Sequence, residues 1–208
     1  MASSVDRSTE RLVFFSDAVV AIALTLLVLP LAEVATEAAD KYPDSHHLFA
    51  DNQAKIYSFV LSFAVIARIW TAHHRLFEQI KAYNRRLMRA NLGWLLAIVV
   101  LPFPTELIGQ FDHDRLNAAF YIGTVLAANA FLFAMIMIVR AEPGLAEDGA
   151  GIPGEQLFTS GVTLGLLAAA LVVAVAVPAI GYFALMFLVL TYPIIWIRQR
   201  LHPAEVTA

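Results

Sequence analysis

Cysteine is absent from this chain of 208 residues, and charged residues make up only 15% of it. Without cysteine the chain has no disulfide, thiolate nucleophile, cysteine-ligated zinc or iron–sulfur cluster. Soluble domains typically carry about 25% charged residues, so the low charge argues against a soluble fold. The net charge of −3 gives no indication of a nucleic-acid partner, which would need a surplus of basic residues.

Catalytic and metal-binding patterns are missing as well. The sequence holds no Ser-His-Asp set, no HExxH and no GxSxG. Adjacent histidines such as His73 and His74 point about 100° apart on a helix, whereas metal-binding pairs prefer i, i+4 spacing. We therefore predict no enzyme activity, no metal site and no cofactor, and interpret these histidines as buried or interfacial hydrogen-bonding residues.

Long hydrophobic runs dominate what is present: 60% of the residues are hydrophobic and the mean hydropathy is +0.70. About 20 residues of helix cross about 30 Å of hydrocarbon. Six segments approach that length: 12–31, 56–72, 91–108, 116–139, 157–177 and 180–197. They lack the two-residue alternation of a membrane barrel. The sequence predicts an all-α integral membrane protein, with six transmembrane helices in a single domain over residues 1–208.

Prolines mark the weakest boundaries of these segments. Pro102 and Pro104 fall inside the third segment, where proline kinks or ends a helix. The last two segments are separated only by the stretch 178–181, which requires a very tight connection.

The basic residues cluster in three regions that fall on one side of the membrane if the chain has six spans. They precede the first segment, lie between the second and third, and follow the sixth: Arg7, Arg11, Arg75, Lys81, Arg85, Arg86, Arg89, Arg198 and Arg200. The positive-inside rule then predicts that both termini are cytoplasmic, in a multi-pass protein of the cell's inner (plasma) membrane. The connection 140–155 is acidic but should lie on the same side, and its glycines indicate a flexible link.

Two ionisable residues interrupt the apolar segments. Asp17 lies early in the first and Arg68 late in the second, and such a charge costs roughly 2.5–3.5 kcal/mol at the centre of a span on insertion scales. Both are expected in the cytoplasmic half, where they would meet directly or through Ser16 and a histidine. We favour a packing network that locks helices together over direct contact with a transported ion, because buried charges are usually paired.

An apolar stripe runs along the first segment. At about 100° per residue, one face carries Phe15, Ala18, Ile22, Thr25 or Leu26, and Leu29, with Asp17 about 140° away from Ile22. The stripe is either ordinary lipid-facing or core surface, or it surrounds an axis shared by several copies of the helix. In the second arrangement, apolar rings would close by dewetting and Thr25 hydroxyls would offer oxygens to a cation.

A short motif resembles a known family. Residues 11–17 match Arg-x-x-x-Phe-Ser-Asp, which is similar to the start of the first helix in the transmembrane protein 175 family of potassium channels. Residues 70–77, from Trp70 to Phe77, are similar to the end of that family's second helix. The resemblance implies six spans per chain and a homotetramer whose four first helices line a central pore. The Thr-Val-Gly-Tyr-Gly filter of ordinary potassium channels is absent from the family and from this sequence.

The resemblance also implies roles for individual residues. Ile22 would be the main hydrophobic constriction, Thr25 would favour potassium over sodium, and Leu29 would form an outer constriction. The network holding the pore helix would comprise the motif and the residues that face it: Arg11, Phe15, Ser16, Asp17, Arg68, Trp70, and His73 or His74. Expected partners are further copies of the chain, membrane lipid and permeant K⁺.

Two other classes of function are compatible with the sequence. A proton-coupled secondary transporter would use Asp17, Arg68 and the histidines as a relay, although no inverted repeat is evident. A non-conducting scaffold or accessory subunit would assemble in the same way but pass no ions.

Overall fold

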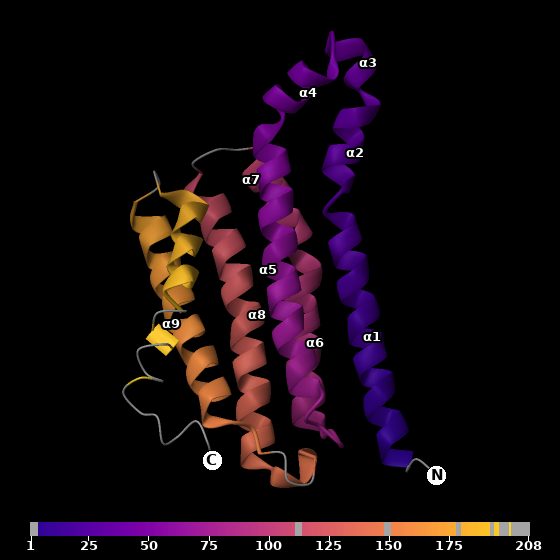
Figure 1. The fold of residues 1–208 in the computed structure, drawn as a ribbon, viewed down its shortest axis with the longest axis vertical. Helices are drawn as coiled ribbons and strands as arrows, with labels where there is room; N and C mark the ends of the chain where they lie inside the picture. The colour runs from indigo at the N-terminus through magenta and orange to yellow at the C-terminus, as the bar shows by residue number, and fades with distance from the viewer. Residues whose placement is uncertain are drawn as a thin grey trace.

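The structure is a computed structural model that describes residues 4–110, 114–147, 151–177, 180–191, 194–195 and 200. These residues form a bundle of long helices that lie side by side (Figure 1). Extended pairing within them is limited to one isolated bridge, Ile80 with Ala146. The predicted all-α fold class is therefore confirmed for this part of the chain.

The helices follow the predicted segments closely. Their bounds are α1 Ser4–Leu26, α2 Leu29–Thr36, α3 Ala38–Lys41, α4 Ser45–Asp51, α5 Gln53–Phe77, α6 Arg85–Val100, α7 Pro102–Gln110, α8 Arg115–Ala141, η1 Pro143–Leu145, α9 Gly154–Ala176 and η2 Gly181–Leu190. Among the described residues five stretches are long and apolar enough to span a membrane: Thr9–Thr36, Gln53–Phe77, Arg85–Gln110, Arg115–Ala141 and Gly154–Ala176.

The sixth predicted segment, 180–197, lies partly outside the described residues. Its described part is the 3₁₀ helix η2, which packs against α9 and α8. The chain is thus a multi-pass membrane protein with five candidate spans in the described ranges, and the sixth span stays a prediction.

Prolines divide two of the spans into paired helices. Pro30 has no N–H and its ring clashes with the carbonyl of the residue four positions earlier, and α1 ends at that residue, Leu26. The first predicted segment is therefore two helices, α1 and α2, rather than one. In the third segment α6 ends at Val100 and α7 begins at Pro102, two residues before Pro104. That break falls where the prolines predicted one.

Polar contacts join the helices in the buried interior. The Ser62 hydroxyl on α5 lies 3.0 Å from the Tyr121 hydroxyl on α8 and 2.8 Å from that of Thr105 on α7. All three side chains are buried. Because α8 also packs between α6 and α9, it is the central helix of the bundle.

The α8–α9 connection is tied to the α5–α6 connection. The Lys81 amide donates to the Leu145 carbonyl at 2.9 Å, and the Glu147 amide donates to the Gln79 carbonyl at 2.9 Å. Asn84 adds a side-chain bond to Glu142 at 2.6 Å. The expectation of a freely flexible link is therefore wrong for residues 142–147, because backbone bonds hold them to a neighbouring loop.

The short helices α2, α3 and α4 project beyond the opposite end of the bundle (Figure 1). Asp44 caps α4 by accepting from the His47 amide at 2.9 Å, and it lies 2.7 Å from His47 Nδ1. The bond from the backbone amide of His47, reinforced by its side chain, lowers the pKa of the exposed Asp44 carboxyl below its ordinary value of 3.8.

Candidate functional site: the first helix and its anchor

Helix α1 lies at one edge of the bundle and packs against α5, α6 and α7 (Figure 1). One of its faces is buried, and the members of that face recur every three or four residues: Leu12, Ser16, Val20, Ala23 and Leu27. This spacing is that of a single helical stripe. The apolar members fill the contact with the bundle, and the polar members of this face are Ser16 and, near the start of the helix, Thr9, which donates to the Lys81 carbonyl at 3.1 Å.

A chain of hydrogen bonds runs from Ser16 into the bundle. Asn91 on α6 donates through Nδ2 to Ser16 Oγ at 3.0 Å, and Ser16 donates to the Leu12 carbonyl at 2.9 Å. The Asn91 Oδ1 lies 2.8 Å from His73 Nε2 on α5. An amide oxygen only accepts, so the bonding pattern assigns the histidine hydrogen to Nε2. All three side chains are fully buried, and together they join α1, α5 and α6.

Aromatic rings enclose the histidine of this chain. The His73 ring stacks on Trp94 with centroids 3.9 Å apart and on Phe77 at 4.4 Å. These contacts fix the ring plane, so Nε2 is held towards Asn91.

A second contact anchors α1 one residue further on. Trp70 on α5 donates through Nε1 to Asp17 Oδ1 at 2.8 Å. His74 stacks on the Trp70 ring with centroids 5.3 Å apart, and its Nε2 lies 3.6 Å from Glu78 Oε1. The two histidines left open by the sequence thus occupy different places: His73 bonds to Asn91, and His74 supports Trp70.

The opposite face of the first span is uncovered in the protomer. Ile22 is 60% exposed and Leu29 is 51% exposed, and Thr25 is exposed between them. The Thr25 hydroxyl donates to the Ile22 carbonyl at 2.8 Å. The three residues predicted for a pore therefore share an open surface, while Asp17 and Ser16 point into the bundle.

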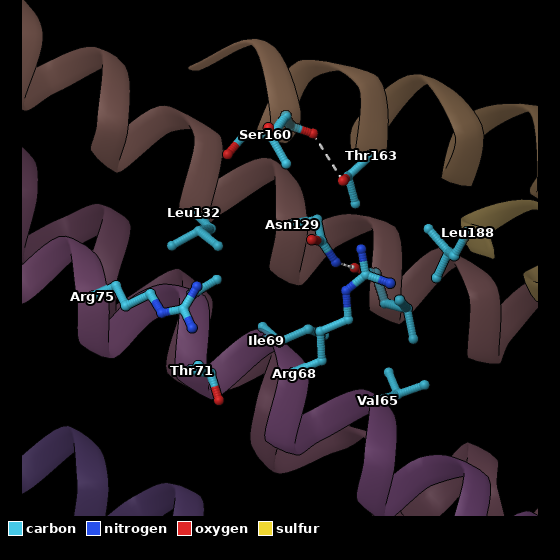
Figure 2. A pocket seen from close by; sticks show the side chains of 13 residues that line it. Val65, Arg68, Ile69, Thr71, Arg75, Asn129, Leu132, Ser160, Thr163 and Leu188 are labelled. Atoms are coloured by element: carbon cyan, nitrogen blue, oxygen red, sulfur yellow. Dashed lines mark hydrogen bonds between the residues drawn. The ribbon is translucent and has the colours of Figure 1, made fainter. Parts of the chain in front are cut away.

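Three residues predicted for the network lie outside it. Arg11 is exposed and Phe15 is 54% exposed. Arg68 does not meet Asp17; it lines a cavity between α5, α8, α9 and η2 (Figure 2). The expected pairing is wrong because Trp70, two residues along α5 and about 160° away around the helix, is the side chain that contacts Asp17.

Asn91 and Trp94 were not among the predicted site residues. Asn91 could have been identified from the sequence, because the amide of an asparagine inside an apolar segment requires hydrogen-bond partners within the membrane. Trp94 could not have been identified in this way, since a tryptophan in a membrane helix is ordinary apolar surface.

Known proteins match parts of this chain in sequence. Residues 11–102 match the family model described as the endosomal/lysosomal potassium channel TMEM175. A potassium channel of Streptomyces collinus is 32% identical over 126 residues, which cover 59% of this chain and 60% of that protein. A potassium channel of Chryseobacterium sp. is 32% identical over 136 residues, covering 64% and 66%.

A longer relative matches over a smaller share of its length. The endosomal/lysosomal proton channel TMEM175 of Danio rerio is 23% identical over 152 residues, which cover 73% of this chain and 29% of that protein. The chain thus matches less than a third of this vertebrate relative and about 60% to 66% of the two bacterial ones.

A solved structure shares the fold. The crystal structure of a lysosomal potassium-selective channel TMEM175 homolog from Chamaesiphon minutus superposes with a TM-score of 0.70 at 22% identity, covering 92% of this chain and 98% of that one. The fold is that of a multi-pass membrane protein, and the similar proteins named above are channels. Over residues 11–102 the chain is therefore similar in sequence to the TMEM175 family, and it shares the fold of the solved homolog.

Proposed function

We propose that the protein is a potassium-permeable cation channel, in which four copies surround a pore lined by α1 and the start of α2. The supporting observation is the contrast between the two faces of the first span. Its polar residues turn inward to Asn91 and Trp70, while the apolar Ile22 and Leu29 are more than half exposed on a helix at the bundle edge.

A ring of Ile22 side chains forms the main constriction in this proposal. Isoleucine offers no oxygen to replace the hydration shell of an ion, so a narrow ring closes by losing its water. Leu29, at the start of α2, forms an outer constriction of the same kind.

Thr25 supplies the polar layer between these rings. Its hydroxyl hydrogen is used in the bond to the Ile22 carbonyl, which leaves the oxygen lone pairs available to accept. A ring of such oxygens favours a partly dehydrated cation, and selection for potassium then depends on ring size and on the number of oxygens.

The polar anchor sets which face of α1 points to the pore. Rotation of α1 by one residue, about 100°, would carry Ser16 and Asp17 away from Asn91 and Trp70. The buried bonds therefore oppose rotation and hold Ile22 towards the shared axis. We assign the protein to the plasma membrane with both termini cytoplasmic, following the basic residues at the α5–α6 end.

Potassium flux into liposomes tests the proposal. The full chain is reconstituted and the flux of K⁺ is compared with that of empty vesicles. Na⁺ and H⁺ are measured in parallel because the similar proteins include both potassium channels and a proton channel. Ile22→Asn is expected to raise the K⁺ flux at least several-fold, because a polar ring stays hydrated.

Val172→Asn is the matched control for this variant. Val172 is 68% exposed on α9, at the other edge of the bundle, so the same polar change there should leave the flux unchanged. Equal effects of the two variants would remove Ile22 from the pore. Flux no higher than in empty vesicles would leave a non-conducting scaffold as the better account.

A further inference from the structure

A polar cavity lies on the side of α5 that faces away from α1. Its volume is about 440 Å³, within the range of roughly 300–1,000 Å³ of small-molecule sites. Residues of α5, α8, α9 and η2 line it, and Figure 2 shows side chains from these helices facing one another across it.

Two arginines dominate its charge. Arg68 and Arg75 are seven residues apart on α5, which places them on one face about 10 Å apart along the axis. Figure 2 shows the Arg68 side chain reaching from α5 towards α8, where Asn129 lies. In the ranges that the structure describes, neither guanidinium has a hydrogen bond or an ion pair, and no acidic residue lines the cavity.

Neutral donors lie opposite these charges. Asn129 uses one amide hydrogen for the Val125 carbonyl at 2.9 Å, which leaves the other free. The Ser160 hydroxyl on α9 faces the same space (Figure 2). The remaining wall is largely apolar and includes Val65 and Leu132. The cavity therefore presents positive charge and hydrogen-bond donors against an apolar wall.

The positive charge of this lining is not balanced unless an anion binds in the cavity. A charged residue within a membrane span is costly and is normally paired, yet among the described residues neither Arg68 nor Arg75 has a hydrogen-bond or ion-pair partner for its guanidinium. Guanidinium groups bind phosphate oxygens through paired, charge-assisted bonds. Arg75 lies two residues before the end of α5 and Arg68 nine residues before it. The two charges thus extend from the edge of the span to about 13 Å inside it.

We propose that this cavity binds a phosphate group, with Arg68 and Arg75 holding its oxygens and Asn129 and Ser160 donating to them. The phosphate belongs either to an anionic phospholipid that enters from the bilayer or to a soluble phosphate. The proposal does not depend on ion conduction, because binding is measured on the protein without flux.

Native mass spectrometry of the purified full chain tests it. The protein in neutral detergent is titrated separately with short-chain phosphatidylglycerol, diacylglycerol and inorganic phosphate. Wild type should retain phosphatidylglycerol and release diacylglycerol, which has the chains but no phosphate. Arg68→Gln should weaken retention about tenfold or more, because one charge-assisted contact is lost.

Arg89→Gln is the matched control, since Arg89 is exposed on α6 and does not line the cavity. If Arg68→Gln yields too little folded protein, Arg75→Gln and Arg68→Lys are compared with Arg89→Gln in its place. Arg68→Lys is expected to retain part of the binding. If only phosphatidylglycerol binds in a way that depends on Arg68, the bound phosphate is that of a lipid. If inorganic phosphate binds equally well and also depends on Arg68, the ligand is a soluble phosphate. Binding that is unchanged by Arg68→Gln, or weakened equally by Arg89→Gln, would overturn the proposal.

Discussion

Helix α5 carries polar residues on two faces that are built in different ways. The face towards α1 and α6 holds Trp70 and His73, whose ring nitrogens bond to Asp17 and Asn91. The face towards α8 and α9 holds arginines that have no such partner among the described residues.

The difference shows what each set of side chains contributes. Groups that find partners inside the bundle lower their own cost of burial and link specific helices, so they contribute to packing and to helix rotation. Charges left without partners in an open cavity add no link between helices, so their presence is better explained by a ligand. The predictions below compare these two faces, beginning with the largest effect.

Asn91→Leu should be the most destabilising change. It leaves the buried His73 Nε2–H without an acceptor and Ser16 Oγ without its donor, at roughly 1–3 kcal/mol for each group. Asn129→Leu is the matched control, because Asn129 bonds only to the Val125 carbonyl of its own helix. Thermal unfolding in detergent measures both variants. Equal losses would mean that the Asn91 chain contributes no more than an isolated asparagine.

Trp70→Phe should follow in size, because it removes the donor to the Asp17 carboxylate. Bonds to charged groups contribute about 1.5–3 kcal/mol. Asp17→Asn should cost less, since an amide oxygen still accepts from Trp70, but it should reduce the fraction of folded assembly. Because Asp17→Asn keeps the bond, the coupling is measured with Trp70→Phe, Asp17→Ala and their double variant, and additive losses there would show that the bond contributes nothing to stability.

Arg68→Gln should change the stability of the lipid-free protein by no more than roughly 0.5 kcal/mol, because it removes no hydrogen bond or ion pair with another described residue. The unfolding midpoint in neutral detergent measures this effect, with Asn91→Leu beside it as the destabilised reference. A loss as large as that of Asn91→Leu would mean that Arg68 holds the bundle together, and the distinction between the two faces of α5 would fail.

Acidification should weaken the cap of α4, which lies outside the spans. The folded state lowers the pKa of Asp44, so its capping contribution is present above the ordinary value of 3.8 and is lost as pH falls through the lowered pKa. The protection of the His47 and Leu48 amides against hydrogen exchange, taken relative to their intrinsic rates at each pH, should therefore fall at strongly acidic pH. Asp44→Asn retains an acceptor and should weaken this dependence, and identical pH profiles would contradict the assignment.

Much of the fold follows from local properties of the sequence. Apolar segments of sufficient length have to form helices in a bilayer, because no other spanning form satisfies their backbone groups. The break at Pro102 was predicted because proline removes a donor and crowds the preceding turn. The same rule applies at Pro30, where the break was not predicted. It could have been, since the cause is equally local.

The partners of the polar residues could not be predicted as well from the sequence. The sequence placed Ser16, Asp17, Trp70 and the two histidines near one another, but it paired Asp17 with Arg68. Residues two positions apart on a helix face nearly opposite ways, so the choice between Arg68 and Trp70 depends on how α5 is rotated against α1.

The sequence by itself determined the five described spans, the proline break at Pro102 and the two unlike faces of the first helix, because hydropathy, proline geometry and helical periodicity act within one segment. Only the tertiary structure decided that His73 rather than His74 meets Asn91, and that Arg68 enters a cavity with no partner in the described chain. These outcomes depend on the rotation and contact of separate helices. How two helices rotate and pack against each other depends on both segments together, so it cannot be predicted from either segment alone.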